Sequence, residues 1–199
     1  MDISNENIWF DPYDNNKYII EENNIIKAVG GDGTLIKSIH LFKNNNKPFF
    51  GVSAGTVNFL MNEEDSVCAE HTIEKFNLID IEVYFTNKVN GNKVISKKFE
   101  AFNDIVLGEF NAWIDFNCIH NDLAIENFKG SGVIVSTSQG STGINKNNLG
   151  TILPLSSKNW SLTGMQTNRV VNHIIEPTEL EISCSSRGDI TLCIDGSYK

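Results

Sequence analysis

The pattern of apolar and polar residues along the chain changes near residue 78. Before that point, two short apolar runs, 25–29 (IIKAV) and 49–54 (FFGVSA), are typical of buried strands. Between them, residues 34–43 carry apolar side chains at helical spacing and predict a helix. The order strand, helix, strand favours a small parallel α/β unit.

Two other stretches complete this first part. Residues 1–24 are mostly polar, and we expect a lead-in with at most one short helix and no strand among the first 20 residues. Residues 63–77 are interpreted as a second helix. The sequence therefore predicts a first, α/β domain over residues 1–77.

The rest of the chain, residues 78–199, predicts a β-rich second domain. Residues 78–109 alternate in hydrophobicity on both sides of an Asn90-Gly91-Asn92 turn, which is a hairpin signature. Residues 111–122 and 130–138 continue as strands, and residues 178–197 predict a final strand pair.

Composition and charge narrow the class of partner. The chain has 199 residues, of which 40% are hydrophobic and 21% are charged, as in ordinary globular domains. The net charge is −9 and the isoelectric point about 4.9. This sign argues against nucleic acid and against an anionic membrane surface as partners. An anionic ligand would have to be held locally, by backbone N–H groups or a few placed cations.

The cysteines predict a reducing, cytoplasmic setting. Four are present, and none forms a C-x-x-C pair or stands at metal-binding spacing from a histidine: Cys68, Cys118, Cys184 and Cys193. We interpret them as reduced thiols. The first ten residues are polar and acidic, unlike a signal peptide, and no run approaches the ~18 apolar residues that span a membrane.

The stretch Gly30-Gly31-Asp32-Gly33-Thr34 joins the first predicted strand to the predicted helix. Such a junction exposes backbone N–H groups at a helix N-terminus, which is a site for phosphate. A carboxylate repels phosphate, so Asp32 is best explained if it binds a metal or takes a proton from an attacking hydroxyl. The alternative is a turn in which Asp32 only caps the helix.

Four stretches, taken in order, resemble the NAD kinase family. GGDGTLIKSI (30–39) resembles the family's signature, and GVSAGTVNFL (51–60) resembles its second loop, G-x-N-x-G-x-L-G-F. AFNDIVL (101–107) resembles its A-x-N-E-V-x-I strand, and residues 130–154 resemble its G-D-G-L-I-V-S-T-P-T-G-S-T-A-Y segment. With LTGMQTNRV and CIDGS as later matches, the resemblance covers residues 25–197.

The resemblance implies a two-domain fold, with an α/β N-terminal domain, a β-rich C-terminal domain and the site in the cleft between them. It also implies transfer of the terminal phosphoryl of ATP, or of polyphosphate in some members, to the 2′-hydroxyl of the adenosine ribose of NAD. Mg²⁺ or another divalent cation would accompany the phosphoryl donor. Homodimers or homotetramers are typical of the family.

The resemblance also implies roles for individual residues. Asp32 would be the general base. The groups that hold phosphate and nucleotide would be Gly30, Gly31, Gly33, Thr34, Phe59 (beside the adenine) and Lys129. The groups that bind NAD would be Asn103, Asp104 (where the family has Glu), Ser141, Thr142 and Gly143.

The sequence departs from the family pattern at several positions. Ser53 replaces an Asn, Asn58 a Gly, Ser131 an Asp, and Gly143-Ile144 an Ala-Tyr pair. The family also has more chain before the glycine-rich turn, so the first domain is expected to be shortened.

These departures leave two alternatives open. One is a nucleotide-binding protein that has lost catalysis. The other is a different kinase, because diacylglycerol- and sphingosine-type lipid kinases share the Gly-Gly-Asp-Gly-Thr turn and phosphofructokinases carry a similar one.

Overall fold

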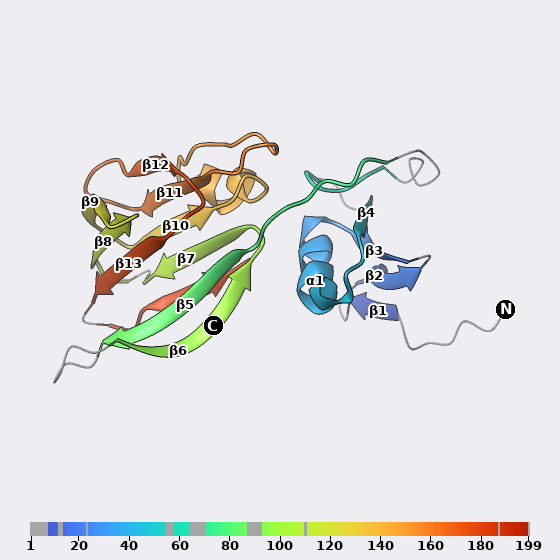
Figure 1. Cartoon of the computed structure of the whole chain (residues 1–199), viewed down its shortest axis with the longest axis horizontal. Coiled ribbons are helices and arrows are strands. Elements are labelled where there is room, and N and C mark those ends of the chain that lie inside the picture. The colour runs from blue at the N-terminus through green and yellow to red at the C-terminus, as the bar shows by residue number, and fades with distance from the viewer. Residues whose placement is uncertain are drawn as a thin grey trace. The chain divides into compact units, whose positions relative to one another are not determined.

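The chain forms two compact units, Met1–Lys75 and Phe76–Lys199, in a computed structural model (Figure 1). The structure describes residues 8–11, 14–22, 24–54, 58–63, 71–86, 93–109, 111–186 and 188–198. Each unit has its own sheets and is described separately below.

In the residues that the structure describes, the first unit is a four-stranded sheet with an α-helix. The strands lie in the order β1 (Ile8–Asp11), β2 (Asp14–Glu22), β3 (Ile25–Gly30), β4 (Phe49–Ser53). β3 and β4 are parallel, and the helix α1 (Asp32–Phe42), followed by the short 3₁₀-helix η2 (Lys43–Asn45), connects them. This confirms the predicted strand–helix–strand unit. Its core is aliphatic: Ile19, Ile26, Ala28, Leu35, Ile39 and Val52 are buried.

The prediction for residues 1–24 is wrong, because β1 and β2 form an antiparallel pair there and β2 pairs with β3. The sheet is therefore mixed rather than parallel. Among the β2 side chains that the structure describes, residues 17–22, Ile19 alone is fully buried, opposite Ala28 of β3. One buried residue in this stretch gives too little alternation to indicate a strand.

The helix predicted over 63–77 is not observed in its described part. Residues 71–77 form neither helix nor strand, and residues 64–70 lie outside the described chain. Ile73 and Phe76, two apolar residues of the described part, are 68% and 37% exposed. They therefore bury too little apolar surface to stabilise helix over residues 71–77.

The second unit contains a six-stranded antiparallel sheet in the order β12-β11-β10-β7-β14-β15. In chain order its strands are β7 (Asp104–Gly108), β10 (Gly132–Ser136), β11 (Trp160–Met165), β12 (Asn172–Ile175), β14 (Thr191–Ile194) and β15 (Ser197–Tyr198). β10 is buried along its whole length, and β7 pairs with it on one side and with β14 on the other. β7 is therefore an inner strand of this sheet, and the turn between β6 and β7 leads directly into it.

Two smaller sheets accompany it. β5 (Ile79–Thr86) and β6 (Lys93–Ala101) form the predicted antiparallel hairpin, whose turn lies outside the described residues. β8 (Ile114–His120), β9 (Leu123–Gly130) and β13 (Leu180–Ser185) form a three-stranded sheet. The final strand pair predicted over 178–197 is wrong, because β13 pairs with β8 while β14 pairs with β7. Local alternation identifies strands but not their partners.

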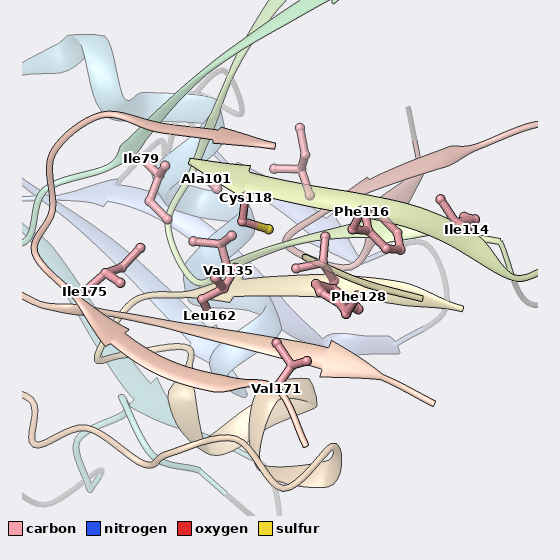
Figure 2. Close-up of a cluster of buried hydrophobic side chains, with 12 residues drawn as sticks. Ile79, Ala101, Ile114, Phe116, Cys118, Phe128, Val135, Leu162, Val171 and Ile175 are labelled. Carbon is pink, nitrogen blue, oxygen red and sulfur yellow. The ribbon is translucent and has the colours of Figure 1, made fainter. Parts of the chain in front are cut away.

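The core of the second unit lies between these sheets (Figure 2). Phe116 of β8 and Phe128 of β9 stack with their ring centroids 5.1 Å apart, and Val135 of β10 and Leu162 of β11 belong to the same cluster. Ile105 and Leu107 of β7 pack against it. Val106 belongs instead to a smaller cluster with Ile134 and Met165, as expected from the alternation of side chains along a strand.

Candidate active site and relation to known proteins

In the first unit the glycine-rich turn is shaped by close packing. β3 ends at Gly30, where a Cβ atom would lie 2.3 Å from Thr34 Oγ1. The Gly31 carbonyl accepts N–H bonds from Thr34 at 2.9 Å and Leu35 at 3.3 Å, which begins α1. Gly33 is exposed, and a Cβ there would meet nothing within 4 Å. The backbone at Gly33 is therefore open to close approach by a ligand.

Asp32 is the first residue of α1, and its carboxylate is fixed from outside the helix. The Phe59 N–H lies 3.0 Å from Oδ2 and 3.2 Å from Oδ1, and the Leu60 N–H donates to Oδ1 at 2.9 Å. A carboxylate has about four lone-pair positions. Oδ2 therefore keeps a free acceptor position while the group is held in one orientation.

The second loop, which supplies these two N–H groups, contains two of the departures from the family pattern. Asn58 Nδ2 donates a hydrogen bond to Ser53 Oγ. The amide that the family carries at position 53 is thus present here from position 58. The Phe59 side chain is 43% exposed.

In the second unit the turn between β6 and β7 carries Asn103 and Asp104. The 137–140 segment packs against its backbone: the Asn103 carbonyl accepts the Thr137 N–H at 2.9 Å, and a Cβ on Gly140 would lie 2.2 Å from the same oxygen. Gln139 Nε2 donates to the Phe102 carbonyl at 2.8 Å. The structure thus brings two of the predicted stretches together.

A carboxylate from the C-terminal hairpin completes this turn. Asp195 Oδ2 accepts the Phe102 N–H at 2.7 Å, and Oδ1 accepts the N–H groups of Asn103 at 2.7 Å and Asp104 at 3.0 Å. The Asp195 N–H donates in turn to the Asp104 carbonyl at 3.0 Å.

The two side chains of the turn are both in unusual environments. Asp104 is buried, and this burial together with the charge of Asp195 raises its pKa to about 7. A Cβ on Gly143 would lie 4.0 Å from Asp104 Oδ2. Asn103 Oδ1 is buried and has no hydrogen-bond partner within the described parts of the chain. A buried acceptor without a partner is costly unless a ligand or water completes it.

A buried polar network holds the segment that follows β10, which includes the π-helical turn η4 (Ser141–Asn145). Asn145 is fully buried; its amide nitrogen donates to the Thr151 carbonyl at 2.9 Å, and its oxygen accepts from Thr163 Oγ1 at 2.7 Å. The Ser141 hydroxyl is also buried, and it donates to the Ser138 carbonyl at 2.8 Å and accepts the Leu153 N–H at 3.0 Å. Its hydroxyl is therefore engaged within the segment.

The neighbours of Ser141 differ in exposure. Thr142 is half-buried and Gly143 is exposed. Ile144, the residue in place of the family's tyrosine, packs against the small cluster of Val106, Ile134 and Met165. The open part of this segment is therefore Thr142-Gly143.

Two residues lie differently from the rest. Lys129 is on β9 in the three-stranded sheet, where its ammonium forms an ion pair with Asp115 at 3.0 Å, and none of its hydrogen bonds reaches another predicted site residue. Ser131 is buried, and both its hydroxyl and its N–H donate to the Met165 carbonyl. An aspartate at position 131 would direct a carboxylate at that carbonyl, so serine suits the local structure.

The residues that the sequence analysis missed are Asp195 and Asn145. An Asp-Gly pair between apolar strands indicates a tight hairpin, but nothing in the sequence indicates which N–H groups its carboxylate accepts. Among the described residues, no group of three His, Cys, Asp or Glu side chains is placed to hold a metal ion. The described residues also include no helix with the length and apolar character needed to cross a lipid bilayer.

Comparison with known proteins gives a consistent result. No family model matches the chain. The NAD kinase of Xylella fastidiosa (strain 9a5c) is 31% identical over 149 residues, which cover 72% of this chain and 56% of that protein. The NAD kinase of Rickettsia felis is 33% identical over 156 residues, which cover 72% of this chain and 57% of that protein. The chain thus spans about half the length of the curated relatives it matches.

Solved structures show the same fold. A yeast NADH kinase, crystallised with NADH, superposes with a TM-score of 0.70 at 18% identity and covers 90% of this chain and 55% of that one. An NAD kinase from Archaeoglobus fulgidus, in complex with ATP, superposes with a TM-score of 0.63 at 20% identity. The match covers 87% of this chain and 68% of that one. Sequence and fold agree with the resemblance of the motifs, and the chain belongs to the NAD kinase family.

Proposed function

We propose that this protein transfers the terminal phosphoryl group of ATP, or of polyphosphate, to the 2′-hydroxyl of the adenosine ribose of NAD. The observation that supports this most directly is the Asp32 carboxylate, held by the N–H groups of Phe59 and Leu60 at a glycine-rich turn. The similarity to NAD kinases adds the identity of the substrate.

Asp32 acts as the general base in this proposal. A ribose hydroxyl is a weak nucleophile at neutral pH, and a positioned carboxylate that takes its proton contributes about 10²–10⁴ in rate. Oδ2, with one N–H donor at 3.0 Å and a free lone pair, is the atom that receives the proton. Phosphate oxygens approach the exposed backbone at Gly33, with Gly31 beside it, at the start of α1. The buried Gly30, and the Thr34 N–H that donates to the Gly31 carbonyl, shape the turn and are not open to phosphate.

The second unit supplies the groups for NAD. Asn103 offers the acceptor Oδ1 that lacks a partner among the described residues, and Asp104 offers a carboxyl group beside Gly143. Both suit ribose hydroxyls, which donate and accept hydrogen bonds. Thr142 and Gly143 contribute the open edge of the segment, and Phe59, from the first unit, offers an exposed ring for the adenine.

A divalent cation, Mg²⁺ in the simplest case, accompanies the phosphoryl donor. The described residues fit such a cation only if ATP itself holds it, because they provide no cluster of three carboxylate, His or Cys ligands. Mg²⁺ in this role takes one or two carboxylates and several phosphate or water oxygens. Asp32 is assigned here to proton transfer, so the phosphate oxygens of the donor would hold the cation.

NADP formation tests the function. Purified protein is incubated with NAD, Mg²⁺ and either ATP or polyphosphate, and the Asp32→Asn variant is assayed beside an Asp122→Asn control, whose aspartate is exposed on the β8–β9 turn. We expect product from the wild type and the control, and a loss of about 10²–10⁴ in kcat for Asp32→Asn. NAD binding without turnover in the wild type would instead support the inactive binder.

We also propose a homodimer or homotetramer in the cytoplasm. β12 ends the six-stranded sheet, and near it Leu149, Val170 and Ile174 are 88%, 92% and 53% exposed. Such an edge is usually covered. In the described part of the chain, the thiols of Cys118 and Cys184 form no disulfide, as suits a reducing compartment. Light scattering at tens of micromolar protein that gave the mass of one chain would contradict the assembly.

A further inference from the structure

The hairpin that joins β14 to β15 has a backbone of defined geometry. Asp195 and Gly196 both have left-handed φ, 47° and 77°. An Asp-Gly or Asn-Gly pair makes such a turn equally well. The turn therefore requires the glycine and tolerates the aspartate, but it does not require the carboxylate.

The carboxylate has a separate set of partners. It accepts the N–H groups of three consecutive residues, Phe102, Asn103 and Asp104, at 2.7, 2.7 and 3.0 Å. Consecutive N–H groups of this kind form a concave anion-binding site. Here the anion is the protein's own side chain, from 91 to 93 residues away in sequence.

The same contacts bring two carboxyl groups close together. Asp195 is the one charged group that raises the pKa of Asp104, besides the burial of Asp104 itself. The residues that face Asp104 from the neighbouring elements carry no charge: Ser136 is its register partner on β10, and Gly143 approaches from η4. Placing a second carboxylate beside a buried one costs stability, and the three N–H bonds that Asp195 accepts offset this cost.

We propose that Asp195 is a positioning residue of the dinucleotide site: it fixes the 102–104 turn so that Asn103 and Asp104 face the ligand. The negative charge of Asp195 also favours the protonated form of Asp104. A protonated Asp104 donates a hydrogen bond and does not repel the pyrophosphate. NAD therefore binds more weakly as the pH rises through the pKa of Asp104, about 7. This inference rests on the proposed function, because it takes NAD as the ligand.

The test compares Asp195→Asn with Asp189→Asn, an exposed aspartate that precedes β14. Asparagine suits the left-handed φ of 47°, keeps an oxygen for two of the N–H groups, and places an NH₂ group against the third. We expect Asp195→Asn to bind NAD about tenfold more weakly by calorimetry at pH 6. The pH at which its affinity falls should also be lower than in the wild type. Asp189→Asn should match the wild type in both.

Equal affinity and an equal pH midpoint for Asp195→Asn and the wild type would overturn the proposal, as would a wild-type affinity that stays constant from pH 6 to 8.5. If Asp195→Asn does not fold, two measurements on the wild-type protein test the proposal instead. Its Phe102 and Asn103 amides should be protected from hydrogen exchange, and the Asp104 carboxyl should titrate near 7 by ¹³C NMR. Unprotected amides or an Asp104 pKa near 4 would reject the role.

These wild-type measurements need no ligand. If the protein fails to bind NAD while they give the expected values, the proposed function fails and the geometry assigned to Asp195 stands.

Discussion

Replacing Asp104 with asparagine should stabilise the free protein, increasingly so as the pH rises. The folded protein holds the Asp104 proton with a pKa of about 7, against a usual value of 3.8. The unfolding free energy therefore falls as pH rises between these values, because the folded state binds the proton that the unfolded chain has released. At 1.36 kcal/mol per pKa unit, the full cost is about 4 kcal/mol above pH 7.

Asp104→Asn removes this titration and keeps the size of the side chain. The gain over wild type should be about 2 kcal/mol larger at pH 8 than at pH 5.5, a range that stays above the isoelectric point of about 4.9. Urea unfolding followed by circular dichroism at several pH values measures this difference. Asp122→Asn, on an exposed turn, controls for the general effect of losing a carboxylate.

A stability difference between Asp104→Asn and wild type that stays constant within ~0.5 kcal/mol from pH 5.5 to 8 would refute the reasoning. It would mean that Asp104 is ionised in the folded protein throughout this range, so that burial beside Asp195 does not control its protonation.

Three further results are expected. Gly30→Ala should destabilise the protein and abolish NADP formation, because its Cβ would lie 2.3 Å from Thr34 Oγ1; thermal melting and the NADP assay measure both. Asn145→Ala should cost about 2–4 kcal/mol of unfolding free energy in urea, since it removes the amide that bonds the Thr151 carbonyl and the buried Thr163 hydroxyl. Ser53→Asn and Asn58→Gly should each lower kcat more than they change KM, and the double variant should recover activity; additive losses would show that the pair does not act as a unit.

Much of the fold could be predicted where sequence signals are local. The apolar run ending at Gly30, the glycine-rich turn and the spacing after Thr34 together indicated β3 and α1, and the Asn90-Gly91-Asn92 turn indicated the β5–β6 hairpin. Each of these elements depends on neighbours within a few residues.

The failures concern packing between distant residues. β2 was missed because Ile19, which is fully buried, is covered by residues distant in sequence, among them Ala28 across the sheet. The helix predicted over 63–77 is absent from residues 71–77, where Ile73 and Phe76 are exposed. The pairing of β13 with β8 depends on which sheet each strand joins, and alternation alone carries no such information.

The candidate site also contains residues that local motifs identify and residues that they do not. Asp32, Asn103 and Asp104 lie in motifs whose residue types suggest their chemistry, whereas Asp195 acts on a turn more than 90 residues earlier. The Ser53–Asn58 hydrogen bond likewise relates two departures that looked independent in the sequence.

The long separation between Asp195 and the turn it holds has a consequence for folding. Contacts between residues 91 to 93 positions apart form late, because a long loop must close before they contribute. The turn with Asn103 and Asp104 is therefore completed only after β14 has paired with β7. During refolding, NAD-binding competence should appear in the slowest phase, after most of the secondary structure has formed.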